Sequence, residues 1–234
     1  MTPRRTGQVT SPFTSDGAPR TLTDWAYHEV KEAILSLRLR PGEPLRESVL
    51  ATMLGVSKTP IREALAWLER DGLVEVEVFK GAVVTGYSRR DLEEIYELRL
   101  LLEVAAARQA AAALAGDSRR RLLSLSAAGR SALEAGNTKR LAQLIDEFDA
   151  ILFDGLENRR IKALISNLRD HVTRIGHLTE QIPGRLEASL NEHDRIIRAI
   201  VDGDPDAAAG TMREHILSVR AEQLALADGQ LGKA

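Results

Sequence analysis

The 234-residue sequence contains no cysteine, which excludes disulfide bonds, thiolate metal sites and a cysteine nucleophile. This absence fits a reducing cytoplasm, where we expect the protein to reside. No apolar run approaches the roughly 20 residues of a membrane-spanning helix. Arg4 and Arg5 near the N-terminus precede no apolar segment of the kind found in a secretory signal. We therefore expect no membrane association.

The sequence also lacks an excess of basic residues. It has 32 Lys and Arg against 34 Asp and Glu, for a formal net charge of −2 at pH 7. Because proteins that bind nucleic acids usually carry a basic patch or domain, binding here would need a local basic face. Arg46, Lys58, Arg62 and Lys80 could form one, although without a motif scattered Lys and Arg indicate only a solvated surface.

Residues 41–86 contain such a motif. A helix-turn-helix needs a small residue where its helices cross, a glycine in the turn and a buried apolar residue in the second helix. Ala51, Gly55 and Ile61 occupy these positions, and Gly55 can adopt the positive φ of the turn. The second helix begins with small or basic residues that suit a DNA groove and its phosphates, namely Ser57, Lys58 and Thr59.

A short hairpin follows the second helix. Asp-Gly at residues 71–72 is a stop signal for that helix, and two β-like runs at residues 73–78 and 82–85 surround Lys80 and Gly81. A hairpin in this place is the wing of a winged helix-turn-helix, which the sequence therefore predicts.

The same stretch resembles the DNA-binding domain of the GntR family of bacterial transcription regulators. The matching elements are, in chain order, Pro41-Gly42, Leu45-Arg46-Glu47, Leu50-Ala51, Leu54-Gly55-Val56-Ser57, Thr59-Pro60-Ile61-Arg62-Glu63-Ala64-Leu65, Leu68-Glu69, Gly72-Leu73-Val74 and Gly81. So many matches in order make the resemblance specific, where a lone Gly-Val-Ser would not be.

This resemblance implies binding to a double-stranded DNA operator and suggests roles for individual residues. Arg62 and Lys58 would reach guanine edges or nearby phosphates. The hydroxyls of Ser57 and Thr59 would contact phosphates at the start of the recognition helix. Lys80 and Gly81 would bring the wing to the minor groove. The remaining candidates are Arg46 and Ser48, the latter at a position where relatives often carry a basic residue.

Composition divides the chain into four parts. Residues 1–20 are rich in Thr, Ser, Pro, Gly and Arg and almost free of apolar residues, which predicts a disordered arm. Residues 21–87 form the DNA-binding domain and residues 88–228 a second domain. Residues 229–234 are expected to be a frayed tail.

The second domain shows helical stripes of apolar residues and no convincing alternating pattern. Ser88 and Asp91 resemble a capping box at its start. Breaks divide the stripes at residues 116–117, 136–137, 156–158, 183–184 and 203–205. We predict a mainly α protein, in which an N-terminal winged helix-turn-helix domain is followed by an all-α bundle of six or seven helices.

This domain resembles the FCD effector domain of the FadR branch of GntR regulators. The matching pieces are Leu98-Arg99, Leu102-Glu103, Phe148, Asn158, Glu192-His193, Ile196, Ala199-Ile200, Ala207 to Ala209 and His215. The resemblance implies a metabolite-responsive regulator, most often a repressor, that binds a small carboxylate and forms a homodimer. One recognition helix reads few base pairs, so we expect a two-fold dimer on a near-palindromic operator.

Several polar residues lie on the apolar stripes of the second domain. Arg99, Asp149, His193 and His215 each have one apolar residue three positions away on one side and one four positions away on the other, and His171 has a similar place. Burial of polar groups is costly unless they are paired, so these residues indicate a polar cavity or a metal site. The structural alternative is hydrogen-bonded core histidines and an ion pair.

Relatives with this domain often hold a divalent metal through an Asp and a His one turn apart and two later histidines. His193 and His215 match the later pair, while Asp149 and Ile145 stand where the earlier His and Asp would be. The resemblance thus implies zinc or nickel on Asp149, His193 and His215, with open positions for a carboxylate. A metal-free pocket in which the histidines bind an organic acid is the alternative.

Two arginines are candidates for binding the carboxylate effector, Arg99 and Arg185, with His171 as a neighbour. A metal-dependent hydrolase would use similar ligands, but the sequence shows no separate nucleophile, general-base motif or phosphate loop. We therefore expect a regulator and not an enzyme, with a metal-free interaction protein as the other alternative.

Overall fold

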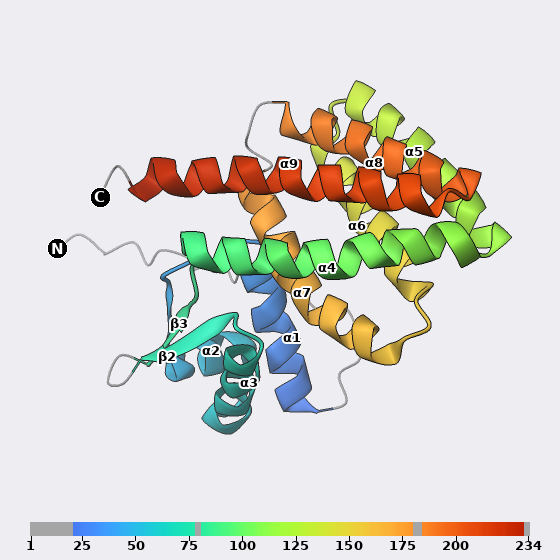
Figure 1. The fold of residues 1–234 in the computed structure, drawn as a ribbon. Helices are drawn as coiled ribbons and strands as arrows, with labels where there is room; N and C mark the ends of the chain where they lie inside the picture. The colour runs from blue at the N-terminus through green and yellow to red at the C-terminus, as the bar shows by residue number, and fades with distance from the viewer. Residues whose placement is uncertain (1–20, 78–80, 180–183, 232–234) are drawn as a thin grey trace. The chain divides into compact units, whose positions relative to one another are not determined.

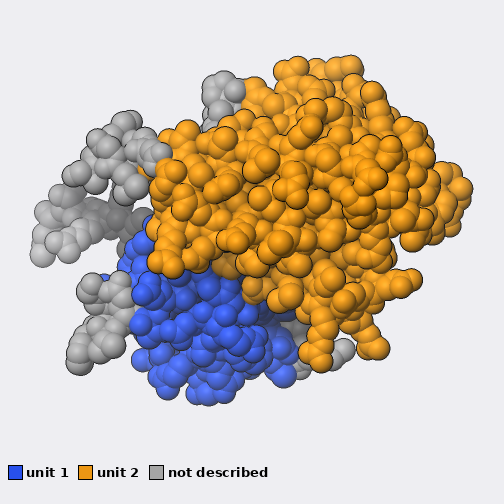
Figure 2. Space-filling model, viewed as in Figure 1, with its two compact units in different colours: residues 1–86 blue, residues 87–234 orange. Residues whose placement is uncertain are grey.

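The computed structural model describes residues 21–77, 81–179 and 184–231 (Figure 1). The chain divides into two compact units, Met1–Gly86 and Tyr87–Ala234 (Figure 2), one residue before the boundary expected from the sequence. The predicted arm at residues 1–20, Lys80 of the wing and residues 232–234 of the tail lie outside the described residues.

The first unit contains three helices and a small antiparallel sheet. Its elements are α1 (Leu22–Leu35), β1 (Pro44–Leu45), α2 (Glu47–Leu54), α3 (Lys58–Arg70), β2 (Val74–Glu77) and β3 (Gly81–Val84). The strand order is β1-β3-β2. Gly55 ends α2 with a φ of 68°, a left-handed conformation that glycine adopts without strain. The predicted winged helix-turn-helix is confirmed, whereas strand β1 was not expected from the sequence.

The core of this unit joins its helices to the sheet. Ile34 of α1, Ile61 and Leu68 of α3 and Leu73 before β2 are fully buried and belong to one apolar cluster. Because Ile61 and Leu68 turn one face of α3 inward, the opposite face of that helix remains available to a partner.

The described part of the second unit consists of six helices, as predicted. They are α4 (Arg89–Ala113), α5 (Gly116–Glu134), α6 (Thr138–Asp154), α7 (Arg159–Thr179), α8 (Arg185–Asp202) and α9 (Pro205–Leu231). The capping box of Ser88 and Asp91 is present at the start of α4. Helix α9 continues through residues 229–231, which were expected to be part of a tail.

Helices α4 and α9 run side by side along the second unit (Figure 1). Apolar side chains from α4, α6 and α8 meet in its main core, among them Tyr96, Phe148 and Ile196. Helix α5 approaches α8 closely at Gly129, where an added Cβ would lie 2.6 Å from Cδ1 of Leu190. Among the described residues, no helix has the length and apolar character needed to span a membrane.

Candidate DNA-binding surface and buried cavity

The start of α3 presents an exposed polar surface. Ser57, Lys58, Thr59 and Arg62 are all exposed, while Ile61 between them is fully buried and anchors the helix. The predicted recognition residues of α3 therefore share the face that points away from the core.

The N-terminus of α3 keeps its backbone amides available. Ser57 is the N-cap residue, with an extended backbone at φ −73° and ψ 169°, but its hydroxyl makes no capping hydrogen bond. The first turn contains no acidic residue. A helix N-terminus of this kind favours an anion, because unpaired amides and the helix dipole both attract negative charge.

Arg62 is held by Glu47 of the preceding helix. Its Nε donates to Oε1 of Glu47 at 2.9 Å and its Nη2 donates to Oε2 at 2.8 Å. The hydrogen bond from Arg62 lowers the pKa of Glu47. Solvent-exposed pairs contribute little to stability. The contact with Glu47 therefore mainly orients the guanidinium of Arg62, and another planar acceptor can take the place of Glu47.

The other predicted DNA-contact residues flank this surface. Arg46 is the N-cap residue of α2 and Ser48 lies in its first turn, and both are exposed. Gly81 begins β3 with a φ of 89°, which favours glycine at this point of the wing.

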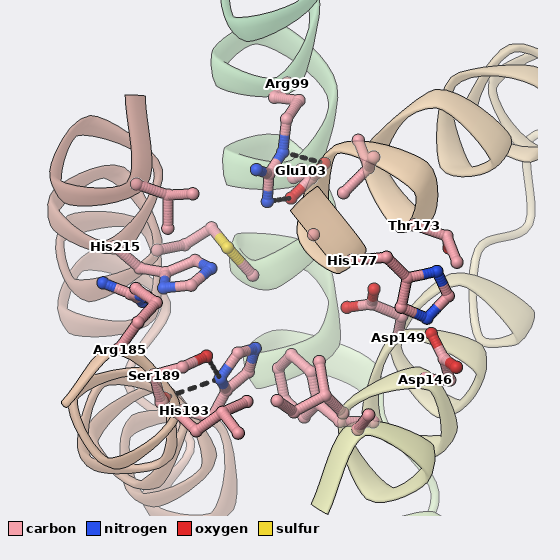
Figure 3. A pocket seen from close by; sticks show the side chains of 18 of the residues that line it. Arg99, Glu103, Asp146, Asp149, Thr173, His177, Arg185, Ser189, His193 and His215 are labelled. Atoms are coloured by element: carbon pink, nitrogen blue, oxygen red, sulfur yellow. Dashed lines mark hydrogen bonds and ion pairs between the residues drawn. The ribbon is translucent and has the colours of Figure 1, made fainter. Parts of the chain in front are cut away.

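The second unit contains a partly open cavity of about 120 Å³ (Figure 3). Helices α4, α6, α7, α8 and α9 all contribute side chains to its wall. The polar groups that face it include Arg99, Glu103, Asp146, Asp149, His193 and His215. Arg185 lines it as well, so that five of the six metal and effector candidates from the sequence meet at one cavity.

His193 is fixed as a neutral imidazole. Its Nδ1 lies 2.7 Å from the backbone carbonyl oxygen of Ser189, and because a carbonyl only accepts, Nδ1 carries the proton. Burial lowers the pKa of His193 to about 3. The other nitrogen, Nε2, therefore keeps its lone pair, and it points into the cavity (Figure 3).

His215 has the same arrangement with a carboxylate. Its Nδ1 lies 2.7 Å from Oε2 of Glu192. Burial alone would raise the pKa of Glu192, but hydrogen bonds from His215 and Arg185 lower this pKa to about 2, so that Glu192 is ionised and accepts. Burial lowers the pKa of His215, and its Nε2 is a second acceptor beside His193, with 4.6 Å between the ring centroids.

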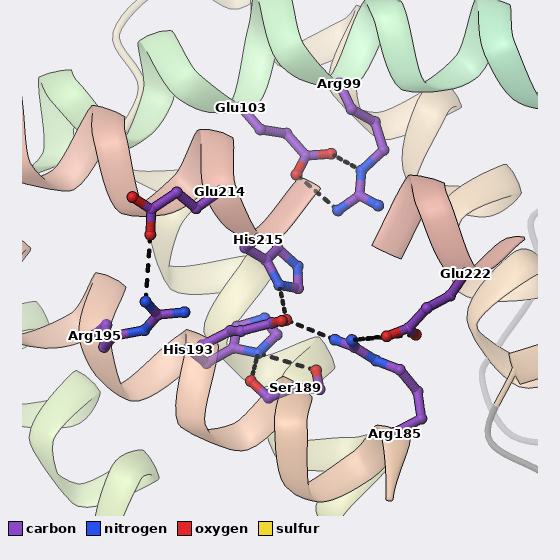
Figure 4. Close-up of polar contacts among 10 residues, drawn as sticks. Arg99, Glu103, Arg185, Ser189, His193, Arg195, Glu214, His215 and Glu222 are labelled. Carbon is purple, nitrogen blue, oxygen red and sulfur yellow. Dashed lines mark hydrogen bonds and ion pairs between the residues drawn. The ribbon is translucent and has the colours of Figure 1, made fainter. Parts of the chain in front are cut away.

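The two arginines predicted to bind a carboxylate effector are already paired (Figure 4). Arg99 donates to Glu103 through Nε at 2.8 Å and through Nη2 at 3.1 Å, and both residues are buried. Arg185 donates through Nη2 to Glu192 at 2.6 Å and through Nη1 to Glu222 at 3.1 Å.

Asp149 differs from these paired groups. Its side chain is partly buried and lines the cavity, and it makes no hydrogen bond or ion pair with the described residues. Burial, followed by the negative charge of Glu103, raises the pKa of Asp149 to about 7, while Arg99 and Arg169 act in the opposite direction. His171, by contrast, is not among the residues that line this cavity, and its Nδ1 lies 3.0 Å from the hydroxyl of Tyr87.

Comparison with known proteins relates both sites to one family. Residues 22–84 match the bacterial regulatory proteins of the gntR family, and residues 94–218 match the FCD domain. The regulator YdhC of Bacillus subtilis strain 168 is 30% identical over 196 residues, which cover 82% of this chain and 84% of YdhC. The chain belongs to the GntR family.

Further likenesses agree with this GntR-family assignment. The "Probable D-xylose utilization operon transcriptional repressor" of Paenarthrobacter nicotinovorans is 29% identical over 180 residues, covering 76% of this chain and 78% of that protein. The crystal structure of a GntR regulator from Rhodococcus sp. RHA1 has the same fold, with a TM-score of 0.75 at 22% identity over 87% of this chain and 97% of that chain. The protein is thus a DNA-binding transcription regulator and not an enzyme.

The cavity of this GntR-family protein does not fit a metal held by three protein ligands. The two imidazoles would suit a metal, since each Nδ1 is held by an acceptor and each Nε2 is available. Among the described residues, however, no three His, Cys, Asp or Glu side chains are placed to hold one. The apolar Ile145 also lines the cavity, at the position where the family resemblance led us to expect a carboxylate ligand.

Sequence reasoning missed several groups of this site. Glu103 pairs with Arg99 at a spacing of four residues, which the helical pattern could have indicated. Ser189 orients His193 from one turn earlier in α8 through its backbone carbonyl, and no sequence signal identifies a carbonyl in that role. Thr173 and His177 of α7 also line the cavity, although neither lies on the stripes that were singled out.

Proposed function

We propose that this GntR-family regulator is a cytoplasmic, metabolite-responsive repressor of the FadR branch. The observation that carries the proposal is a winged helix-turn-helix with an exposed recognition surface in a chain whose second unit holds a polar cavity. A relative named as a repressor supports repression over activation.

In this proposal Arg62 reads a guanine edge. Glu47 orients the guanidinium of Arg62 through two hydrogen bonds, from Nε and from Nη2. A guanidinium can donate a similar pair of hydrogen bonds to O6 and N7 of guanine. Lys58 reaches a guanine or a phosphate beside it, while the free hydroxyl of Ser57 and that of Thr59 bind phosphates at the amino end of α3.

The flanking elements add contacts to the DNA backbone. Arg46 and Ser48 lie at the exposed start of α2, and Glu47 between them links α2 to Arg62. The wing, with Gly81 and Lys80, meets the minor groove. These contacts fix the register of the protein on DNA, and the base contacts of α3 give sequence preference.

We further propose a homodimer on a near-palindromic operator, because a single recognition helix contacts few base pairs. Leu98 and Leu101 lie one turn apart on α4 and expose 48% and 65% of their surfaces. Exposed apolar residues of this kind favour contact with another protein surface, and a second copy of the chain is the occupant that two-fold recognition requires.

The cavity is the proposed effector site. A ligand that prefers one arrangement of α4, α8 and α9 would shift the population of DNA-binding states, because coupling arises from differential affinity. The family resemblance predicts a carboxylate, with or without zinc or nickel. The pairing of Arg99 and Arg185 and the absence of three grouped metal ligands among the described residues favour a different ligand.

Footprinting across the regulator's own promoter region tests the proposal, since such regulators often control neighbouring genes. We expect a protected, near-palindromic site at moderate salt, weaker protection with Arg62→Ala, and unchanged protection with Arg70→Ala at the far end of α3. Absence of protection by the parent protein would refute the function.

A further inference from the structure

The effector cavity presents hydrogen-bond acceptors to a ligand. Asp149 faces it with a carboxylate that has no partner among the described residues. His193 and His215 face it with Nε2, because their Nδ1 protons are used by the carbonyl of Ser189 and by Glu192. A ligand that pairs with these three groups must donate hydrogen bonds to them.

The positive charges that a carboxylate ligand would need are already balanced by glutamates. Arg99 is bound at two atoms by Glu103, and Arg185 is bound by Glu192 and Glu222. A carboxylate could still accept from the N–H groups that these pairs leave unused, such as Nη1 of Arg99, but it would add a second negative charge beside glutamates that already neutralise both arginines.

The charge around the cavity also disfavours an anion. Glu103 and Asp146 add negative charge near Asp149, and Arg99 and Arg169 oppose it. Arg99 is neutralised by Glu103, and Nη2 of Arg169 donates to the backbone carbonyl of Asp146. Among the charged side chains that line the wall, Asp146 and Asp149 are therefore the ones without an ion-pair partner among the described residues.

We propose that the effector is a small hydroxylated amine whose ammonium group binds Asp149 and whose hydroxyl groups donate to His193 and His215. The inference rests on the proposed function, since it names the class of ligand for the effector cavity. The acceptors are too dispersed to surround one ion, because no three such side chains among those described are placed to hold a metal. A ligand with donors on several atoms can reach them all.

The size of the cavity fits this class. Its volume of about 120 Å³ is similar to that of an apolar cavity of about 150 Å³ that holds one benzene molecule. A molecule of six or so non-hydrogen atoms, with donors at both ends, therefore matches both the volume and the polarity of the site.

Three probes with the same diol skeleton test the charge preference on the full-length protein at pH 8, above the pKa of about 7 of Asp149. They are 3-amino-1,2-propanediol, glycerol and glycerate, which carry an ammonium, a hydroxyl and a carboxylate at the same position. Isothermal titration calorimetry should rank the amine first, about tenfold or more tighter than glycerol, because a charged hydrogen bond is worth about this factor. Glycerate should bind more weakly than glycerol.

Two aspartates of α6 provide a matched pair of variants. Asp149→Asn should remove the advantage of the amine over glycerol, whereas Asp154→Asn, at an exposed position on the same helix, should preserve it. Tighter binding of glycerate than of the amine, or an amine preference that survives Asp149→Asn, would overturn the proposal.

Two further measurements separate this inference from the regulator function. Zn²⁺ and Ni²⁺ are titrated alone, and stoichiometric micromolar binding lost in His193→Gln would identify a metal site and overturn the amine. Operator retention is measured on the same samples. If DNA binding is intact but no probe binds, the ligand class is wrong and the regulator function stands.

Discussion

Replacing Asp149 by asparagine should stabilise the protein at neutral and alkaline pH but not near pH 4. In the unfolded chain this carboxyl group has an ordinary pKa of 3.8, whereas in the folded protein burial and the charge of Glu103 raise its pKa to about 7. The folded state therefore favours the neutral acid. Asparagine resembles that neutral form and does not titrate.

The direction of the pH dependence follows from proton linkage. Between pH 4 and pH 7 the folded protein holds a proton on Asp149 that the unfolded chain has released, so the stability of the parent falls as pH rises through this range. Well above pH 7 the carboxylate is charged in both the folded and the unfolded state, and the stability that the proton on Asp149 contributed is fully lost. The advantage of Asp149→Asn should thus be absent near pH 4, grow with pH and level off near pH 8.

The full difference between the two pKa values of Asp149 corresponds to about 4 kcal/mol. That value is an upper bound, because the side chain is only partly buried and faces a cavity large enough for water. Solvation in the cavity reduces the penalty on the charged form, so we expect Asp149→Asn to stabilise the second unit by ~1–2 kcal/mol at pH 8.

Urea denaturation followed by circular dichroism at 222 nm measures the effect. Both tryptophans, Trp25 and Trp67, lie in the first unit, so tryptophan fluorescence would report the wrong transition. Asp154→Asn is the control, since it removes an exposed carboxylate from the same helix. Equal pH dependence of unfolding in the parent and in Asp149→Asn would refute the reasoning.

Four further results are expected. Arg62→Ala should weaken operator binding about five- to hundredfold and reduce base preference in competition gel shifts, whereas equal binding would contradict its role. Gly55→Val should destabilise the first unit by ~1–2 kcal/mol in urea, because valine is strained at a φ of 68°. Leu98→Asp combined with Leu101→Asp should give a monomer in sedimentation velocity at micromolar concentration, where we expect the parent to be a dimer; a monomeric parent would exclude the dimer. Elemental analysis of protein purified without chelator should find no stoichiometric zinc or nickel, and one metal per chain would support the site predicted from the sequence.

The sequence predicted the first unit well because its signals are local. The turn of the helix-turn-helix depends on the conformation of Gly55 and on side chains within a few residues of it. Strand β1 was missed for the opposite reason. It has two residues, Pro44 and Leu45, and exists only because they pair with Val83 and Ala82 of β3, a contact that no local pattern indicates.

In the second unit, helical periodicity predicted which side chains turn inward but not what they meet. His193 and His215 come from α8 and α9 and lie against each other, and both line the cavity as expected of inward residues. His171 was singled out in the same way, yet it contacts Tyr87 and is not among the cavity-lining residues. A stripe identifies a face of a helix, whereas the neighbour across that face depends on the packing of the whole bundle.

The chemistry of the cavity depends on which groups remain unpaired after folding. The sequence offers two arginines near the site, and this composition favours an anionic ligand. Folding pairs Arg99 with Glu103 four residues away and Arg185 with Glu222, 37 residues away, and it leaves the carboxylate of Asp149 facing the cavity. Because the distant pair forms only when α8 packs on α9, the sign of charge offered to a ligand is a property of the tertiary structure, and here it is opposite to the one that the arginines alone would predict.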